Sequence, residues 1–312
     1  MELGHVEAFL AIARTGGFAK GSAALHLSQP AISRRIGLLE SELGAPLFDR
    51  LGRGVTLTDA GRAFLPHAQA LLASMRDGVA AVHAVRGTGY GAVTLALVGT
   101  LASSALARRL REFREAYPAL DVRLRTALSA EVSALVLRGD AALGLRYGPD
   151  PHPGLVSGIV NQERLVPVCP PGHPAAAGGP DLAAALAGQR WLSFPPRPGA
   201  RDEPYALALQ QLLAAHGLGG AEIVPVDSLT AQKRLAEAGF GLAIVPESSL
   251  DEEFRAGTLC AIDAPALTAT MPVALIRRRN AFQSGAMRAL AAALSPAAGP
   301  RTGRTGQEGV QT

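Results

Sequence analysis

The chain is poor in cysteine, in lysine and in aromatic residues. Its 312 residues include 2 cysteines and 1 tryptophan, and aromatic side chains make up 4%. Cys169 and Cys260 are far apart in the sequence and form no CxxC pair, which argues against a disulfide framework and against a zinc site. We therefore interpret both as small buried side chains in a protein of a reducing compartment.

Long apolar runs are absent as well. No unbroken apolar segment has the length of a membrane span. The N-terminal sequence MELGHVEAFLAIA has acids at Glu2 and Glu7 and no basic stretch before its short apolar run, so it is unlike a signal peptide. We expect a soluble, cytoplasmic protein without a membrane partner. Hydrophobic residues still make up 48% of the chain, enough for sizeable cores in about two or three domains.

The motifs of common enzymes and cofactor sites do not occur. The 7 histidines are scattered, and there is no HExxH, GxSxG, GxGxxG or P-loop spacing. Cys169 and His173 are near each other, but two ligands without further partners make a poor metal site. We predict that the protein is not an enzyme and holds no cofactor or metal. An α/β enzyme without a recognisable catalytic motif is the alternative.

What the sequence does have is an excess of basic charge, nearly all of it arginine. The formal net charge is +4 and the pI is about 9.5, while Lys20 and Lys233 are the only lysines. Such an excess is compatible with nucleic-acid binding but does not establish it.

Residues 1–58 predict a winged helix-turn-helix. Apolar side chains at helical spacing indicate a first helix that ends at Gly16–Gly17 and a short second helix after it. The third helix contains the segment LHLSQPAISRRI and ends at Gly44. Two short β-prone runs, 47–50 and 55–57, flank a turn that contains glycine, which is a hairpin signal.

The third helix is suited to reading DNA. Ser28 can cap it, and Pro30 is tolerated in its first turn. Its expected buried stripe consists of Ile32, Ile36, Leu39 and Leu43. In a helix-turn-helix the start of this helix enters the major groove, where glutamine can pair with adenine and arginine with guanine. The predicted DNA contacts are Lys20, Ser28, Gln29, Pro30, Ser33, Arg34, Arg50 and Arg53.

The basic residues of this set have different expected roles. Lys20 and Arg50 are predicted to contact phosphates, and Arg53 at the hairpin tip is predicted to reach a neighbouring groove or backbone. The alternative for Arg34 and Arg35 is that they only solvate a surface helix. For Arg35 the sequence does not decide between a phosphate contact and solvation.

Residues 59–91 predict one long helix followed by a hinge. Thr58 is a good N-cap, Pro66 is expected to bend the helix, and the glycines between 87 and 91 mark the hinge. The apolar residues recur at spacings of three and four: Phe64, Leu65, Ala68, Leu71, Leu72, Met75, Val79 and Val82. We expect this stripe to pack against a second copy of the chain. Packing on the chain's own C-terminal domain is the alternative.

Residues 92–295 predict an α/β domain. Candidate strands and helices alternate along it, which is typical of mainly parallel sheets covered by helices. We expect two sheets, and hence two Rossmann-like subdomains. The first consists of about 92–161 and 268–295, and the second of about 162–267. The polar, glycine-rich end, 296–312, is predicted to be a disordered tail.

Side chains that follow these strands form a candidate ligand site, because ligands of open α/β sheets bind beyond the carboxyl ends of the strands. Hydroxyl groups at helix N-termini suit a carboxylate or another small anion, and Arg146 can add a charge-assisted pair. The alternatives are that Ser129 and Ser228 only cap helices and that Arg146 pairs with Asp150. The candidate residues are Thr100, Leu101, Ser103, Ser129, Arg146, Phe194 and Ser228.

The segment GFAKGSAALHLSQPAISRRIGLLESELGAPLFDR and its continuation RLGRGVTLTDAGRAFLPHA resemble the DNA-binding segment of LysR-type transcriptional regulators. The specific part covers roughly the first third of the chain and continues weakly through the α/β region. The resemblance implies an effector domain like a type 2 periplasmic solute-binding protein, with Thr100 and Ser129 at effector-contacting positions. The chain departs from the family at Gly21 and Ser22, where alanines are usual, and at Ala19, where threonine or serine is frequent.

We therefore predict a sequence-specific transcriptional regulator that binds a dyad-symmetric DNA site as a homodimer or homotetramer. Its DNA binding or bending is expected to respond to a small-molecule effector in the C-terminal domain. RNA polymerase is a candidate further partner. A solute-binding protein of the transport kind is another alternative, but it would need an export signal and no winged helix.

Overall fold

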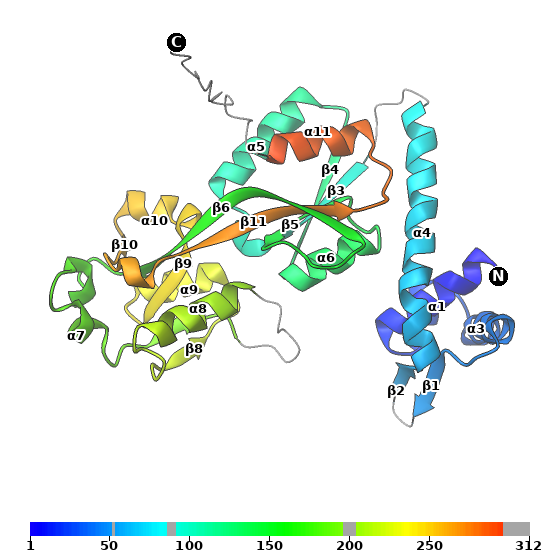
Figure 1. The fold of residues 1–312 in the computed structure, drawn as a ribbon, viewed down its shortest axis with the longest axis horizontal. Helices are drawn as coiled ribbons and strands as arrows, with labels where there is room; N and C mark the ends of the chain where they lie inside the picture. Colours follow the sequence, from blue (N-terminus) through cyan, green and yellow to red (C-terminus); the bar gives the residue numbers. More distant parts are fainter. Residues whose placement is uncertain (52–53, 86–91, 196–203, 296–312) are drawn as a thin grey trace, which may run out of the picture.

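The computed structural model describes residues 1–51, 54–85, 92–195 and 204–295. A small N-terminal domain, a long helix and a larger α/β domain follow one another along the chain (Figure 1). None of the helices in these ranges has the length and apolar character that crossing a bilayer would require. The predicted tail, 296–312, and the predicted hinge, 87–91, lie outside the described residues.

The N-terminal domain is a winged helix-turn-helix. Its elements are α1 (Leu3–Thr15), α2 (Phe18–Ala24), α3 (Gln29–Leu43), β1 (Phe48–Leu51) and β2 (Gly54–Leu57). The two strands pair antiparallel, with Arg50 opposite Val55. Val6, Phe9, Ile32 and Leu39 are all fully buried and form the centre of its core. The fold of this part confirms the prediction from the sequence.

One residue of the expected buried stripe of α3 is not buried. Leu43 is 41% exposed, whereas Ile32, Ile36 and Leu39 are at most 1% exposed. Leu43 is the last residue of α3, and the left-handed Gly44 that caps the helix turns the chain away from the core there. The prediction that Leu43 belongs to the core was therefore wrong.

Glycine at position 21 fits the close packing of α2 on α1. A Cβ added to Gly21 would lie 2.9 Å from Cγ1 of Ile12 and 3.2 Å from the Ile12 nitrogen. Ile12 is fully buried and has no room to withdraw. The glycine costs helix propensity of about 1 kcal/mol against alanine, and in return the two helices approach closely.

The long helix α4 (Asp59–Val85) contacts both domains. Its N-cap is Thr58, whose Oγ1 accepts a hydrogen bond of 3.0 Å from the Gly61 N–H. Ala68 packs in the core of the winged helix. Further along, Arg76 donates to Asp140 at 2.8 Å, and Arg278 donates to Asp77 at 2.7 Å. The helix thus contacts its own C-terminal domain through these ion pairs, whereas the alternative prediction had the apolar stripe packing there.

The later part of the predicted apolar stripe of α4 is not covered by any of the described residues. Leu71, Met75, Val79 and Val82 are between 38% and 60% exposed, although all four are large and apolar. They recur at helical spacing on one side of the helix, away from Ala73, which is fully buried. One side of the helix therefore contacts the rest of the chain, and the opposite side exposes apolar side chains.

The C-terminal domain contains one continuous sheet, in the order β4-β3-β5-β11-β6-β9-β7-β8, with β10 paired to β6. Its strands are β3 (Ala92–Val98), β4 (Asp121–Ala127), β5 (Leu143–Tyr147), β6 (Leu155–Cys169), β7 (Trp191–Ser193), β8 (Ile223–Pro225), β9 (Leu242–Pro246), β10 (Cys260–Ala261) and β11 (Ala269–Arg278). The strands β4, β3 and β5 form a parallel first arm, and β9, β7 and β8 form a parallel second arm. The pairs between these arms, β5-β11, β11-β6 and β6-β9, are antiparallel.

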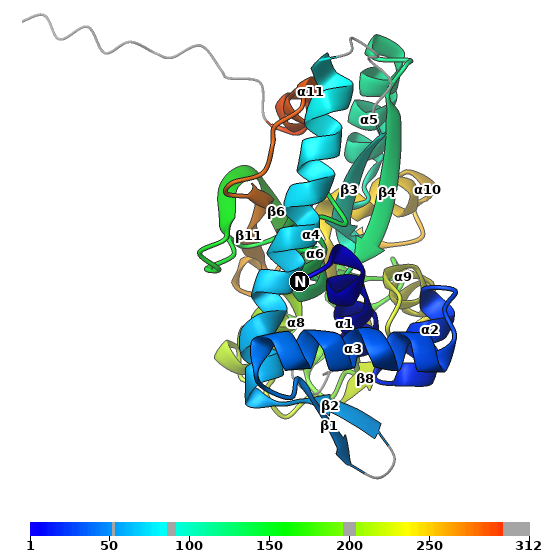
Figure 2. The same ribbon diagram turned by 90° about the vertical axis from the view of Figure 1, so that its right-hand side faces the viewer.

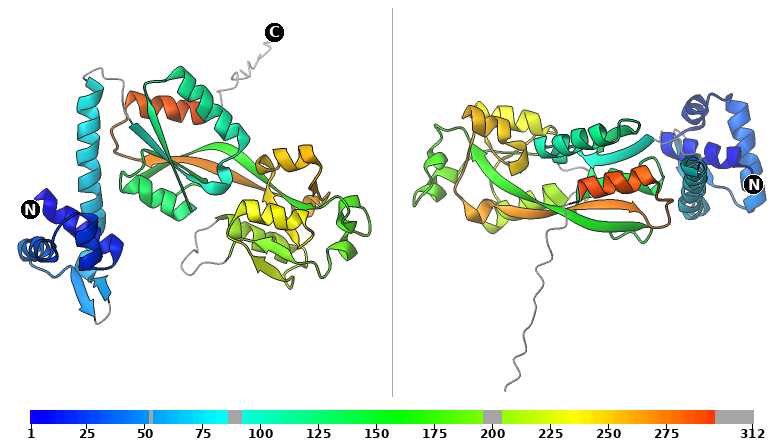
Figure 3. Two further views of the ribbon diagram at one scale, coloured as in Figure 1. Left: turned by 180° about the vertical axis from the view of Figure 1, so that it is seen from behind. Right: turned by 90° about the horizontal axis from the view of Figure 1, so that it is seen from above.

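The expectation of two separate, mainly parallel sheets was therefore wrong in its details. The cause is the length of β6 and β11, which run antiparallel to each other through both arms (Figure 3). Their pairing shifts register between Val273 and Ala274, which face Asn161 and Ile159 and so leave Val160 as a bulge. Two α/β arms on either side of this central pair correspond to the two predicted subdomains.

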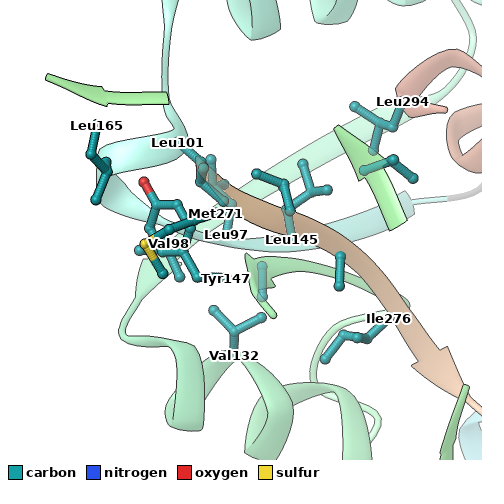
Figure 4. Close-up of a cluster of buried hydrophobic side chains, with 14 of the residues drawn as sticks. Leu97, Val98, Leu101, Val132, Leu145, Tyr147, Leu165, Met271, Ile276 and Leu294 are labelled. Atoms are coloured by element: carbon teal, nitrogen blue, oxygen red, sulfur yellow. The ribbon is translucent and has the colours of Figure 1, made fainter. Parts of the chain in front are cut away.

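Helices cover both faces of each arm. They are α5 (Ser104–Ala116), α6 (Ser129–Leu137), α7 (Leu182–Leu186), α8 (Pro204–Ala215), α9 (Leu229–Glu237), α10 (Asp251–Ala256) and α11 (Gly285–Leu294), with 3-10 turns η1 (Gly99–Leu101), η2 (Pro174–Ala177), η3 (Glu247–Ser249) and η4 (Pro265–Leu267). In the first arm α5 and α11 lie on one face and α6 on the other (Figure 1). Figure 4 shows the core of this arm gathered around β11, with Tyr147 near Met271.

Candidate DNA-binding surface and effector site

The start of α3 is capped and exposed. Oγ of Ser28 accepts a hydrogen bond of 3.3 Å from the Ala31 N–H, and Pro30 lies in the first turn, where no intrahelical donor is lost. Gln29, Pro30 and Arg34 are exposed, and Ser33 is half-buried. Figure 2 shows α3 along one side of the domain, with the β1–β2 hairpin projecting beside it. The helix therefore presents polar side chains at its N-terminal end, where the sequence predicted base contacts.

Arg35 is turned toward the protein. Its Nη1 donates to the carbonyl oxygen of Gly4 at 3.4 Å, and the guanidinium packs so closely that a Cβ on Gly4 would lie 3.1 Å from it. Arg34, one residue earlier, is exposed. The two neighbouring arginines thus face different surroundings, a distinction that the sequence could not make.

The other predicted DNA contacts are Lys20, Arg50 and Arg53. Lys20 lies on α2 and is exposed. Arg50 lies on β1 opposite Val55. Arg53 lies outside the described residues. Lys20 and Arg50 thus belong to the two elements that flank α3 in sequence.

In the first arm of the C-terminal domain, the end of β3 meets the end of β5. Thr100 in η1 is 9% exposed, and its Oγ1 lies 2.9 Å from the hydroxyl of Tyr147, the last residue of β5. Burial raises the pKa of Tyr147, so the phenol stays protonated. Leu101 is buried in the core, and Ser103 caps α5 by accepting from the Leu106 N–H at 3.3 Å.

Arg146 is 4% exposed and is already paired. Its Nη1 donates to Oγ of Ser133 at 2.9 Å and forms an ion pair with Asp150. Burial raises the pKa of Asp150, but hydrogen bonds from Ser133 and from the His152 N–H, together with the charge of Arg146, outweigh burial and leave the pKa below its usual range. Asp150 therefore stays ionised and neutralises much of the charge that the sequence offered to an anion.

Two buried polar atoms of the first arm have no partner among the residues that the structure describes. Oγ of Ser129 and Nε of Arg146 are both buried, and neither has a hydrogen-bond partner among the described residues. Ser129 is fully buried and is the first residue of α6, which begins after Leu128 without a side-chain cap. Ser129 is thus not the helix cap of the alternative prediction. Unpaired buried polar atoms cost about 1–3 kcal/mol each, so a partner for either atom would stabilise the folded protein.

The second arm brings two further predicted residues to its own strand ends. Phe194 follows β7 and is half-buried, and Ser228 caps α9 by accepting from the Ala231 N–H at 3.3 Å. The two arms touch where Ser104, the first residue of α5, donates to Asp251, the first residue of α10. The carboxyl ends of β3 and β9 therefore approach each other across the central pair of strands.

Glu163 lies between the arms and was missed by the sequence analysis. It is 5% exposed on β6, and its two oxygens accept from Oγ of Ser248 at 2.9 Å and from the Ser248 N–H at 3.3 Å. Burial raises the pKa of Glu163; the Ser248 hydrogen bonds oppose this rise, and the neighbouring Glu247 adds to it. No local motif marks Glu163, because only the pairing of β6 with β9 brings it to η3.

Two family models match this chain. Residues 3–62 match the bacterial regulatory helix-turn-helix protein, lysR family, and residues 86–299 match the LysR substrate binding domain. The chain belongs to the LysR family of transcriptional regulators. Such regulators join a DNA-binding helix-turn-helix to an effector-binding domain, which agrees with the fold described above.

Individual relatives are regulators as well. The chain is 29% identical to a probable cat1 operon transcriptional activator of Acinetobacter lwoffii, over 80% of this chain and 82% of the relative. It is 28% identical to full-length CbnR solved with its target DNA, over 94% and 99% of the two chains, with a TM-score of 0.60. A full-length OxyR variant from Pseudomonas aeruginosa shares the fold, at 18% identity and a TM-score of 0.70 over 94% of each chain.

Within the described ranges, no three His, Cys, Asp or Glu side chains are arranged to hold a metal ion. The polar groups that stand together are hydroxyls, one arginine and two carboxylates. Their chemistry is that of ligand recognition by hydrogen bonds and charge.

Proposed function

We propose that this LysR-family regulator reads a dyad-symmetric operator with the N-terminal turns of α3 from two copies of the chain. The observation that supports it is the contrast on α3: Gln29 and Arg34 are exposed at the capped start, while Arg35 is held by the Gly4 carbonyl. Arg34 is then the guanine reader, Lys20 and Arg50 hold phosphates, and Arg53 reaches a neighbouring groove or the backbone. CbnR, one relative of similar length, was solved with its target DNA.

We further propose that the exposed stripe of α4 joins two chains into a homodimer. Leu71, Met75, Val79 and Val82 have the helical spacing of a helix-to-helix seam. A two-fold dimer would place two α3 helices in major grooves about 34 Å apart or a multiple of it. Pairing of two dimers into a tetramer, and contact with RNA polymerase on the operator, would follow from this arrangement.

The effector is proposed to bind between the carboxyl ends of the two arms. Ser129 Oγ and Arg146 Nε are buried groups of the first arm without hydrogen-bond partners among the described residues, and Thr100 and Tyr147 add hydroxyls after β3 and at the end of β5. A small carboxylate suits these donors, with Phe194 and Ser228 approaching from the second arm. The effector must bind one arrangement of the arms better than the other, since equal binding shifts nothing.

The test of DNA reading uses two arginines that are neighbours on one helix. Operator DNA is first selected from a random pool by the purified protein, and a dyad motif is expected. Arg34→Ala should then lower discrimination between operator and scrambled DNA by tenfold or more, since a bidentate arginine–guanine pair contributes about 1–3 kcal/mol. Arg35→Ala removes the same charge but should keep that discrimination. Equal discrimination by both variants would disprove the role of Arg34.

The test of the effector site uses Thr100→Val, which keeps the shape and removes the hydroxyl that contacts Tyr147. Small carboxylates are screened by the rise in melting temperature of the wild-type protein. The variant should lose most of the effector-dependent change in operator binding while its binding without effector stays within about twofold. Loss of operator binding itself would show that Thr100 has a structural role instead.

A further inference from the structure

The two cysteines of the chain lie opposite each other in the second arm. Cys169 at the end of β6 and Cys260 on β10 are direct antiparallel partners, and their sulfur atoms are 3.7 Å apart. Both are free thiols. The interpretation from the sequence, which treated them as two unrelated buried side chains, missed this pairing because 91 positions separate them.

The backbone geometry permits a bond between them. Directly opposite residues of an antiparallel pair have Cα atoms about 4.5–5.5 Å apart, which lies within the range of disulfides, about 4.4–6.8 Å. The sulfur atoms would have to close from 3.7 Å to about 2.05 Å. Side-chain rotation on two fixed strands can supply that movement.

The two thiols differ in access. Cys169 is fully buried, whereas Cys260 is partly exposed. Burial and, to a lesser extent, the neighbouring Cys260 thiol together raise the pKa of Cys169 to about 12. Cys169 is therefore protonated and shielded from reagents in solution, and Cys260 is the thiol that an oxidant reaches first.

We propose that Cys169 and Cys260 form a site of reversible oxidation, in which a hydroperoxide converts the two thiols into an intrachain disulfide. Deprotonated Cys260 attacks the peroxide oxygen, the O–O bond breaks, and the leaving oxygen takes a proton to give water or an alcohol. The resulting sulfenic acid is attacked by the Cys169 sulfur. The S–O bond breaks, hydroxide leaves with the Cys169 proton as water, and two electrons have passed from the thiols to the peroxide.

The position of the pair gives the bond a mechanical consequence. β10 is a two-residue strand that pairs with β6, and the chain continues from it through η4 into β11. β6 and β11 are the two strands that join the arms. A Cys169–Cys260 bond would therefore fasten the approach to β11 onto the end of β6 and stiffen the second arm at the amino end of β9, away from the carboxyl ends of the strands.

The test uses the reduced full-length protein, treated with hydrogen peroxide and then alkylated with a maleimide under denaturing conditions. Because the chain has 2 cysteines, the expected result is unambiguous: intact mass shows a monomer that has lost two hydrogen atoms and takes up no maleimide, and dithiothreitol restores both thiols. Full alkylation of both thiols, oxygen adducts without a bond, or disulfide-linked dimers alone would each overturn the proposal.

Two single variants test the order of the steps. Cys169→Ser should still be oxidised at Cys260 and should accumulate a sulfenic acid that dimedone traps. Cys260→Ser leaves the buried thiol alone and should react with peroxide at least about tenfold more slowly than Cys169→Ser. Equal rates in the two variants would contradict the assigned order. The wild-type measurement stands if either variant fails to fold.

Discussion

Gly61 lies where the first turn of α4 crosses the chain just before the wing. A Cβ added there would overlap the carbonyl oxygen of Leu47 and would also crowd the Leu57 side chain. Thr58 fixes the same crossing, because its Oγ1 donates to the Pro46 carbonyl at 2.6 Å and its N–H donates to the Leu47 carbonyl at 3.0 Å. One residue without a side chain thus lets the linker helix start against the winged helix.

Gly61→Ala should therefore destabilise the N-terminal domain by at least about 2 kcal/mol, since backbone atoms cannot yield to the new methyl group. Gly37→Ala is the matched control, because Gly37 lies on α3 with nothing within 4 Å of an added Cβ. That change should be neutral or should stabilise the helix by up to about 1 kcal/mol. Urea unfolding of both variants is the measurement, and equal effects of the two would refute the steric argument.

At the level of the elements, β6 and η3 are linked by the carboxylate of Glu163, which Ser248 holds by two hydrogen bonds. Because its pKa is raised in the folded protein, the folded state binds the Glu163 proton more tightly than the unfolded chain does. The free energy of unfolding therefore falls as pH rises from about 4.3, the ordinary glutamate value, through the raised pKa.

Glu163→Gln should remove this component, since its amide can still accept from the Ser248 N–H and cannot ionise. The variant should gain stability relative to the wild type as pH rises, and the two should converge in acid. Urea unfolding between about pH 4 and pH 8 checks this. Glu112→Gln, a change at an exposed site, should show no such divergence. A Glu163→Gln difference that does not vary with pH would count against the assignment.

The elements also show how far the sequence could be read. Helices with strong caps were predictable: Ser28 and Thr58 accept the hydrogen bonds expected of them. The first ten residues of β6 were not, because apolar and polar residues are mixed in the segment from Leu155 to Arg164 and only Leu165–Cys169 makes an apolar run. The position of β6 in the sequence also does not indicate that this strand spans both arms.

The sites divide in the same way. The rule on strand ends led to Thr100 and Ser129, because both follow strands directly in the sequence. It could not find Glu163 or the Ser133 contact of Arg146, since those depend on pairing between segments far apart in the chain. Arg146 was predicted as a candidate from the sequence, and the structure shows that it is paired with Asp150.

At the scale of the whole molecule, α4 contacts both the winged helix-turn-helix and the effector domain. One side contacts the effector domain through Arg76–Asp140 and Asp77–Arg278, and the exposed stripe is the surface proposed above to pack against a second copy. A shift of the effector domain against α4 would therefore be transmitted to the distance between two α3 helices. Ala73, which is fully buried, packs close to Gly139 beside these two ion pairs.

Val79→Asp should weaken self-association at least tenfold, or about 1.4 kcal/mol, because it places a charge in the middle of the proposed seam. Val79 is 54% exposed in the single chain, so the fold should be unaffected by the change. Ala70→Asp adds the same charge at an exposed position off the stripe and should leave the oligomer intact. Sedimentation over a range of concentrations separates the two. A Val79→Asp protein that stays dimeric would move the interface elsewhere.

The central strand of the effector sheet is synthesised near its end. β11 lies between β5 and β6, yet β3 to β10 all leave the ribosome before it. The core of the winged helix comes from the first 72 residues, so that domain can fold while the rest of the chain is still being made. Translation that stops ahead of Ala269 would leave β5 and β6 as open edges that invite pairing with other chains. Such a fragment would still carry a DNA reader, but one that no effector controls.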